Sequence, residues 1–339
     1  MKYKSVIVTK RGGPEVLQVV ENDLRLPSVG EARIKILATP VCLPDVEARY
    51  GRSPFKPKIP FVPGYAIIGV VDAVGRQMRP SGKGVTRAAV GDRVAALTAY
   101  GGYSEYIFLR EEQLIPVPTT LDPAEAAPLI LNYIVAYQTL HRSAKVKAGD
   151  KVLIVGASGG IGTAFLQLGQ LAKLTMYGIA SKSKHPILTE YGATPIDYRA
   201  QDFVEMIQKA EPDGLDVVFD GIGGDYIKRG FSLLRRGGIY VGYANPLSIT
   251  RTLRFLGQVI LLHLLPNGRS ARYYGTGSSR LNRRPFLEDW ATLFKLLEEG
   301  KIKPVIEKKF PILEAAQANE LLESGKVTGN LVLLAPELL

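Results

Sequence analysis

Cysteine is almost absent from this sequence: Cys42 is the only one among 339 residues. A single cysteine cannot form an internal disulfide bond, and it cannot supply a four-cysteine zinc lobe. The first eight residues, Met1 to Val8, enter a strand-like pattern directly, without the apolar core and small-residue cleavage site of a secretory signal. We therefore expect a cytoplasmic protein of a reducing compartment.

The amino-acid composition shows no strong bias. Hydrophobic residues make up 46% of the chain and charged residues 22%, which excludes a disordered, collagen-like or disulfide-rich protein. The sequence has no repeat at a fixed period and no low-complexity tract. Its length favours about two domains, each with a core of its own.

Acidic residues are missing from one long stretch. None occurs between Asp225 and Glu288, whereas eleven lysines and arginines fall there and equal the whole net charge of +11. A basic protein of this kind raises the question of nucleic-acid binding. However, charge concentrated in one segment favours a phosphate-bearing cofactor, an anionic ligand or an anionic surface over sequence-specific recognition of a nucleic acid. We expect no nucleic-acid partner.

The composition and the hydrophobic pattern of the sequence change near Pro123. The preceding residues are rich in glycine and proline with short apolar runs, which predicts a mostly β domain. After it, a helical stretch from Ala124 to His141 leads into alternating strands and helices, and this alternation predicts βαβ units around a parallel sheet. The expected strands are 151–155, 174–180, 215–219 and 238–241, followed by a helix at about 286–299 and a last strand at 331–334.

A glycine-rich turn follows the first of these strands. Glycines at such a position let the backbone turn sharply and let a pyrophosphate approach the N–H groups at the start of the next helix. The spacing is G-x-x-G-x-x-G, and it gains weight from the strand before it and the helix after it. The alternative is an ordinary glycine-rich turn. The residues expected to bind cofactor here are Gly156, Ser158, Gly159, Gly160, Ile161 and Gly162.

The expected partner of a ribose 2′-hydroxyl is also missing. NAD sites carry an Asp or Glu about 20 residues beyond the turn, yet no acid occurs from Thr163 to Thr189. The second strand ends instead in Ser181, Lys182, Ser183 and Lys184, which can bind and neutralise a 2′-phosphate. NADPH is therefore favoured over NADH, although the two lysines could simply be the solvated charges of a loop.

These motifs together resemble the medium-chain dehydrogenase/reductase superfamily, in its zinc-free quinone oxidoreductase branch. The resemblance runs along the whole chain, through Phe61 to Gly64, Gly69 to Gly75, Val90 to Val94, Gly101 to Tyr106, the glycine-rich turn, Ile196 to Arg199 and Val217 to Asp220.

The resemblance implies an α/β fold in which a GroES-like β domain (1–123 and 302–339) surrounds an inserted Rossmann domain with a doubly wound parallel sheet (124–301), and an active site in the cleft between them. It also implies a homodimer, and it places Ser181, Lys184 and Tyr198 at the 2′-phosphate. We add Gly242 and Tyr243, which follow the strand 238–241, to the expected cofactor-binding residues.

Zinc ligands can be checked against the same resemblance. Catalytic zinc needs about three protein ligands, and zinc-dependent relatives have a cysteine three residues before an aspartate, as Cys42 precedes Asp45 here. Their second ligand, a histidine, is replaced by Tyr65, and their third falls near Leu131. We therefore expect no metal. Cys42 then either packs in the cleft or touches the substrate.

Without a metal, the substrate itself must accept hydride. Quinones, conjugated enones and enoyl thioesters do so, because the arriving charge delocalises onto oxygen, which then needs a hydrogen bond or a proton. Tyr50, Tyr65 and Tyr133 are the candidate donors, and Tyr65 is the best because it stands at the vacated ligand position. We expect an NADPH-dependent reductase of quinones or activated alkenes. The alternatives are a zinc-free alcohol or aldehyde reductase and a non-enzymatic NADPH-binding interaction or stress protein.

One apolar segment remains without a function. Leu253 to Leu265 lies among the arginines of the acid-free stretch and, at thirteen residues, is too short for the ~20 that a bilayer span requires. It could be a buried Rossmann helix or dimer contact, a mobile wall of the substrate cleft, or a surface helix on an anionic membrane. We expect a place beside the cleft or at the dimer contact rather than on a membrane.

Overall fold

The computed structural model describes residues 1–339 except 53–55, 76–87, 244–248 and 281. The chain divides into two units: unit 1 comprises residues 1–131 and 290–339, and unit 2 comprises residues 132–289. Each unit has its own sheet and its own hydrophobic core.

Unit 1 is built around a largely antiparallel sheet of seven strands within the described residues. These strands are β3 (Glu31–Val41), β4 (Ala66–Val74), β5 (Arg93–Leu97), β6 (Tyr106–Arg110), β7 (Ile115–Pro116), β14 (Ile306–Pro311) and β15 (Asn330–Leu334). Their order is β14-β15-β3-β4-β5-β7, and β6 also pairs with β3. The C-terminal strand β15 lies antiparallel to β3, so both ends of the chain contribute to this sheet.

A hairpin and several helices pack with this sheet in unit 1. The hairpin joins β1 (Lys2–Val8) to β2 (Leu17–Asp23), and the helices include α1 (Leu43–Arg49), α2 (Pro123–Pro128) and α10 (Ala315–Glu323). Apolar side chains from alternate strand positions and from α10 form the core, among them Ile34, Ile67, Ala318 and Leu331.

Unit 2 contains a parallel sheet of six strands among the residues described. The strands are β8 (Lys151–Val155), β9 (Thr175–Ala180), β10 (Thr194–Asp197), β11 (Leu215–Asp220), β12 (Leu234–Gly242) and β13 (Ser270–Tyr273). Their order is β10-β9-β8-β11-β12-β13. Counted from β8, this is 3-2-1-4-5-6, the order of a dinucleotide-binding sheet whose ligand sits where the order reverses, beside β8 and β11.

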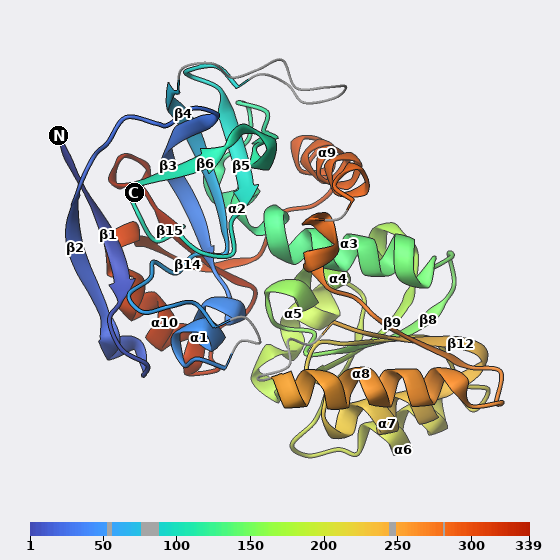
Figure 1. Ribbon diagram of the computed structural model, residues 1–339. Helices are drawn as coiled ribbons and strands as arrows, with labels where there is room; N and C mark the ends of the chain where they lie inside the picture. Colours follow the sequence, from blue (N-terminus) through green and yellow to red (C-terminus); the bar gives the residue numbers. More distant parts are fainter. Residues whose placement is uncertain (53–55, 76–87, 244–248, 281) are drawn as a thin grey trace. The chain divides into compact units, whose positions relative to one another are not determined.

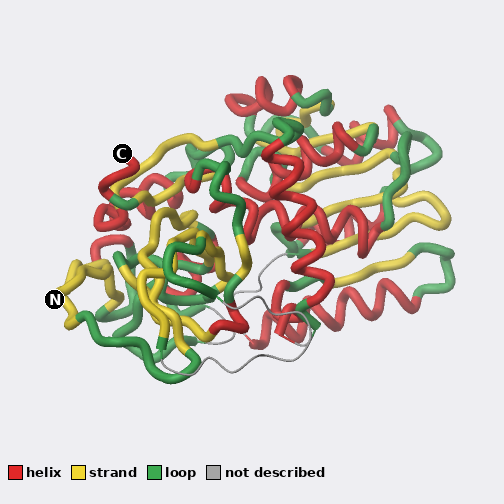
Figure 2. The backbone as a smooth tube through the Cα atoms, turned by 90° about the horizontal axis from the view of Figure 1, so that it is seen from above, coloured by secondary structure: helices red, strands yellow, loops and turns green. Residues whose placement is uncertain are grey.

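Helices cover both faces of this sheet (Figures 1 and 2). Figure 1 shows α4 (Gly160–Leu171) and α5 (His185–Glu190) on one face, and α6 (Phe203–Ala210), α7 (Asp225–Ser232) and α8 (Ile249–Leu264) on the other. Phe203, Phe231 and Phe255 from the second group share one core with β8 to β12. The expected fold class, a GroES-like β domain with a Rossmann sheet, is confirmed.

The helical stretch expected at 124–141 is interrupted. The helix α2 passes at Pro128 into a wide π-helical turn (Leu129–Tyr133), and α3 (Ile134–Gln138) passes into a second one (Thr139–Ala144). Proline lacks the N–H that a regular helix needs, so a change of helical pitch next to Pro128 is the expected response. After β13, α9 (Arg284–Glu298) covers the helix expected at 286–299.

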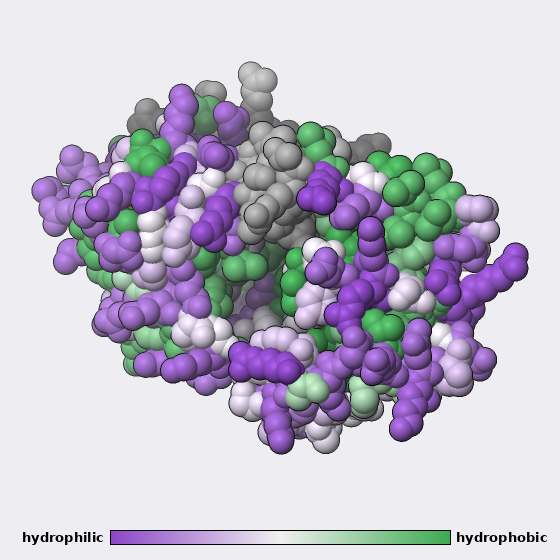
Figure 3. Space-filling view, turned by 90° about the horizontal axis from the view of Figure 1, so that it is seen from below, coloured by the Kyte–Doolittle hydropathy of each residue, from purple (hydrophilic) through white to green (hydrophobic). Residues whose placement is uncertain are grey.

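The helix α8 is buried on one side only, whereas one interpretation of its sequence was a buried helix. Its positions 255, 259 and 262 face the core, whereas Leu253, Ile260, Leu261 and Leu264 on the opposite side are 58–71% exposed. Figure 3 shows hydrophobic side chains gathered on the side of unit 2 that carries this helix. The apolar residues of this segment therefore lie on two faces of the helix, and only one face is buried within the described chain.

Among the residues that the structure describes, no helix is both long and apolar enough to cross a membrane.

Candidate functional site

The glycine-rich turn joins β8 to α4 with two kinds of glycine. Gly156 has a φ of +81°, which side chains disfavour. A Cβ at Gly162 would stand 2.3 Å from the Gly156 carbonyl oxygen, so α4 can pack this closely on the turn only with glycine there. A Cβ at Gly159 would meet nothing nearer than 3.8 Å. Gly159 therefore leaves open space at the start of α4.

That open space has the chemistry of a pyrophosphate site. Gly159 caps α4, a helix of twelve residues with no acidic side chain in its first turn. Its N-terminal N–H groups carry the positive end of the helix dipole and favour an anion. The turn also lies beside the point where the strand order reverses. The residues present therefore fit a dinucleotide.

A second loop is fixed beside this turn by Asp220, at the end of β11. The buried Asp220 carboxylate accepts hydrogen bonds from the N–H groups of Ile222 (2.7 Å) and Gly223 (2.9 Å) and from the Tyr240 hydroxyl (2.6 Å). Burial raises the pKa of Asp220, and these donors oppose the rise. The Ile222 side chain lies 3.7 Å from where a Gly156 Cβ would stand. Neither Asp220 as the anchor of this loop nor Ile222 as a neighbour of Gly156 was expected from the sequence, because only the strand pairing brings the two loops together.

The expected residues Gly242 and Tyr243 extend the same edge. The Tyr243 N–H donates to the Asp220 carbonyl oxygen at 2.9 Å. A Cβ at Gly221 would stand 2.5 Å from the Tyr243 ring, so Gly221 provides the space for that ring. The ends of β11 and β12 are thus joined, next to the glycine-rich turn of β8.

The strand register brings together the expected 2′-phosphate residues. Ala180 of β9 pairs with Asp197 of β10, so Ser181 and Tyr198 follow at the same edge. Lys182 and Lys184 lie in the short turn after Ser181. Tyr198 is 46% exposed, and the Arg199 guanidinium lies 5.4 Å from its ring centre. Arg199 was not among the expected cofactor residues, although its position next to Tyr198 was a signal for it.

In unit 1, Asp45 ties Cys42 to the loop that carries Tyr65. Its Oδ2 accepts the Cys42 N–H at 3.0 Å and the Tyr103 hydroxyl at 3.2 Å, and its Oδ1 accepts the Gly64 N–H at 2.9 Å. Cys42 is buried, and burial, followed by the charge of Asp45, raises the pKa of its thiol. The thiol therefore stays protonated and is no nucleophile at neutral pH.

The three candidate tyrosines have different surroundings. Tyr65 is half-buried, and its carbonyl oxygen accepts the N–H groups of Thr98 and Ala99. The Tyr50 hydroxyl donates to Glu323 at 2.8 Å. Tyr133 is fully buried, and its hydroxyl donates to Gln167 of α4 at 2.8 Å. The hydroxyl groups of Tyr50 and Tyr133 thus already have partners, and Tyr133 belongs to unit 2 whereas the other two belong to unit 1.

The donor set does not fit a catalytic zinc. Asp45 already accepts three hydrogen bonds, and the Cys42 thiol is held protonated. Leu131, at the third ligand position of zinc-dependent relatives, is a buried hydrocarbon. Within the described parts of the chain, no group of three His, Cys, Asp or Glu side chains could hold a metal ion.

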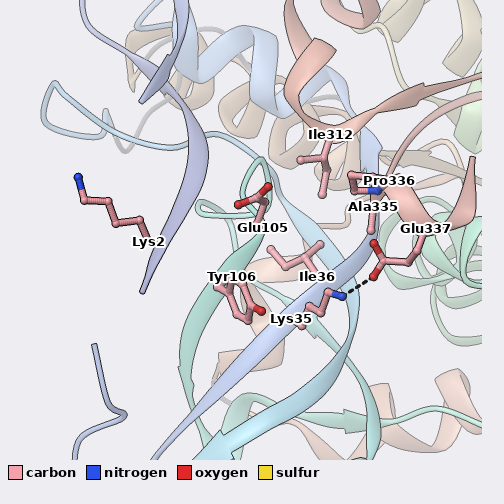
Figure 4. Close-up of a pocket in the computed structure, with 9 residues that line it drawn as sticks. All are labelled: Lys2, Lys35, Ile36, Glu105, Tyr106, Ile312, Ala335, Pro336 and Glu337. Carbon is pink, nitrogen blue, oxygen red and sulfur yellow. Dashed lines mark ion pairs between the residues drawn. The ribbon is translucent and has the colours of Figure 1, made fainter. Parts of the chain in front are cut away.

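A separate pocket of about 290 Å³ lies in unit 1 between the first and last segments of the chain (Figure 4). Lys35 and Glu337 line it and form an ion pair at 2.6 Å, and Glu105 accepts the Lys4 N–H. None of the expected site residues lines this pocket. We therefore assign it no part in the reaction.

Comparison with known families agrees with this geometry. The family described as alcohol dehydrogenase GroES-like domain matches residues 28–119, and the family described as zinc-binding dehydrogenase matches residues 191–333.

Individual relatives extend the similarity to nearly the whole chain. The human synaptic vesicle membrane protein VAT-1 homolog is 33% identical over 322 residues, which cover 91% of this chain and 80% of the relative. Quinone oxidoreductase of Sus scrofa is 31% identical over 338 residues, 97% of each chain. Among solved structures, Escherichia coli quinone oxidoreductase complexed with NADPH has a TM-score of 0.84 at 26% identity and covers 98% of this chain and 99% of that one.

Proposed function

Because the chain belongs to the medium-chain dehydrogenase/reductase superfamily, in its quinone oxidoreductase branch, we propose that it is an NADPH-dependent oxidoreductase that transfers hydride to a quinone or an activated alkene without a metal. The observation that carries the proposal is the edge of the unit 2 sheet. There a glycine-rich turn open to pyrophosphate lies beside a basic, acid-free strand end.

The cofactor assignment follows from this edge. The N-terminus of α4 would hold the pyrophosphate, and Ser181, Lys182, Lys184 and Tyr198 would hold the 2′-phosphate. A solved neighbour is described as complexed with NADPH, which supports the same choice. When bound, NADPH supplies the hydride.

The substrate class follows from the missing metal ligands. Cys42, Tyr65 and Leu131, at the three ligand positions, do not form a zinc site that could polarise a substrate carbonyl. The hydride acceptor must therefore be electron-poor by itself. Hydride addition to a quinone or enone leaves a negative charge on oxygen. The Tyr65 hydroxyl donates a proton to that oxygen, and water returns the proton to the tyrosine.

We also propose that the protein is a homodimer that buries the exposed face of α8. Leu253, Ile260, Leu261 and Leu264 form an apolar stripe, and β13, which packs beside α8, forms an open edge of the sheet described. An apolar face next to an unpaired strand edge suits a second copy of the chain.

A substrate panel tests the proposed reaction. We expect NADPH oxidation with quinones, enones or enoyl thioesters and none with simple aldehydes or ketones. Reduction of carbonyls alone would favour the alcohol or aldehyde reductase, and tight NADPH binding without turnover would favour a non-enzymatic role. Either result contradicts the proposal.

The variant Tyr65→Phe tests the proton donor. Loss of a positioned acid typically costs 10²-fold or more, so turnover should fall at least tenfold while NADPH affinity stays unchanged. Tyr106→Phe, in the separate pocket of unit 1, is the matched control and should keep full turnover. Full turnover of Tyr65→Phe would reduce Tyr65 to a packing residue.

A further inference from the structure

Among the described residues, one buried carboxylate, that of Asp45, has no role in the proposed reaction but binds both the Cys42 segment and the Tyr65 loop of unit 1. Asp45 lies in the first turn of α1 and is only 2% exposed. Through Oδ2 it holds the backbone of Cys42, and through Oδ1 it holds the backbone of Gly64, the residue before Tyr65. A structural carboxylate of α1 would need only the first of these bonds, which caps its own helix.

The loop held by Asp45 is fixed from its other side as well. The Gly64 carbonyl oxygen accepts hydrogen bonds from the Gly102 N–H (3.1 Å) and the Thr98 hydroxyl (2.8 Å). Gly64 has a φ of +108°, and a Cβ there would stand 2.3 Å from Gly102. The contact with Gly102 thus leaves Gly64 no room to shift toward that residue. Asp45 supplies the tie on the Cys42 side.

We propose that Asp45 is a positioning residue that holds Cys42 and Tyr65 in one fixed arrangement, and that this arrangement is needed for turnover. The proposal rests on the proposed function for its kinetic part. Its structural part, the fixed place of Cys42, stands independently.

The groups around Asp45 make this tie sensitive to pH. Burial raises the pKa of Asp45 to about 7, opposed by the N–H groups of Cys42 and Gly64, the Tyr103 hydroxyl and the charge of Arg49. The facing titratable groups are the Cys42 thiol, Tyr103 and Arg49. Arg49 is itself paired with Glu323, and Asn319 of α10 donates to the Tyr103 hydroxyl. Only the ionised carboxylate can accept all three hydrogen bonds at full strength.

Asp45→Asn tests the tie, because an amide has one oxygen and must turn its NH₂ group toward Cys42 or Gly64. We expect kcat/KM with a quinone to fall at least tenfold, and the rise of wild-type activity with pH near 7 to disappear. Asp72→Asn makes the same chemical change at a partly buried ion pair of β4 that contacts neither Cys42 nor Gly64, and it should keep the kcat/KM and pH profile of the wild type. NADPH affinity should stay unchanged in both variants.

Alkylation of Cys42 provides a readout that needs no activity. Cys42 is the only cysteine of the chain and is 4% exposed, so uptake of iodoacetamide reports the opening of this one segment. Because loss of the Asp45 charge also lowers the pKa of the thiol, rates are compared on the plateau at high pH, where the opened thiol is fully ionised in every variant. We expect alkylation at least tenfold faster in Asp45→Asn than in wild type and Asp72→Asn. Equal rates in all three proteins would overturn the proposal. A wild type without reductase activity would overturn only the proposed function.

Tyr103→Phe keeps the test decisive if Asp45→Asn does not fold. It retains the carboxylate and both backbone hydrogen bonds but removes a donor that lowers the pKa of Asp45. The rise of activity with pH should therefore move to higher pH. A pH profile identical to that of wild type would contradict the role of Asp45.

Discussion

At the scale of single residues, neighbouring side chains decide what each candidate can do. Cys42 and Asp45 are three residues apart, yet the thiol is kept protonated while the carboxyl titrates near neutrality. Burial raises the pKa of both groups, but the carboxyl starts from a much lower ordinary value, and three hydrogen-bond donors directed at Asp45 limit its rise. The Cys42 sulfur contacts only the Pro40 carbonyl oxygen at 3.8 Å among the contacts described.

Cofactor choice gives one prediction at this scale. NADPH should bind at least tenfold more tightly than NADH, a difference of about 1.4 kcal/mol. Lys184→Ala and Arg199→Ala should each remove much of this preference and leave NADH affinity nearly unchanged, because their charges act on the 2′-phosphate alone. Lys209→Ala, an exposed lysine of α6, is the control. Titration of both cofactors measures the effect, and equal wild-type affinities would refute the assignment.

Stability against pH gives a second prediction. The folded protein raises the pKa of Asp45 from its usual 3.8 to about 7. Its contribution to stability is therefore complete below pH ~4 and is lost as the pH rises through about 7. Relative to Asp45→Asn, the free energy of unfolding of the wild type should fall by about 3 kcal/mol between pH 5 and pH 8. Urea unfolding of both proteins at these two pH values measures this, and a constant difference would contradict it.

At the scale of elements, the turn from β8 to α4 combines two functions in neighbouring glycines. Gly162 allows the helix to pack on the turn, and Gly159 leaves the space in front of it. One motif therefore serves both the fold and the ligand.

The two functions can be separated by substitution. Gly162→Ala places a methyl group against the Gly156 carbonyl and should destabilise the protein by about 2 kcal/mol. Gly159→Ala meets no such obstacle at its φ of −78°, so it should leave stability nearly unchanged while it weakens NADPH binding at least tenfold. Urea unfolding and NADPH titration of each variant test this pair. Normal NADPH affinity in a stable Gly159→Ala protein would exclude the turn as the pyrophosphate site.

At the scale of the whole molecule, the charge of the acid-free stretch is partly neutralised by acids from elsewhere in the chain. Arg229 pairs with Asp202, and Arg235 pairs with Asp216. The net charge of +11 remains, so an anionic surface is still an alternative occupant for the exposed face of α8.

Leu261→Asp distinguishes the two occupants. In the dimer interpretation the wild type sediments as a dimer, and this exposed substitution should give a folded monomer, because a carboxylate would be buried without a partner. Leu26→Asp, an exposed leucine of unit 1, should stay dimeric. Salt-sensitive binding of the wild type to anionic vesicles, lost in a Leu261→Asp variant that still dimerises, would favour the membrane instead.

Features that depend on neighbours along the chain can be read from the amino-acid sequence. Glycines between a strand and a helix, alternating βαβ segments and the absence of acids after Thr163 predicted the Rossmann sheet, the family and NADPH, and the fold class and family are confirmed. Each of these signals is local, because turn geometry and helix periodicity act over a few residues.

Contacts between distant segments became visible only in the folded chain. Strand order brought Ile222 beside Gly156, register placed Ser181 and Tyr198 at one edge, and Asp45 met Tyr103 across 58 positions of sequence. It also gave α8 an exposed apolar face that a run of leucines cannot distinguish from a buried one. Such outcomes depend on packing and on pairing between strands, and hydrophobic periodicity fixes neither of them.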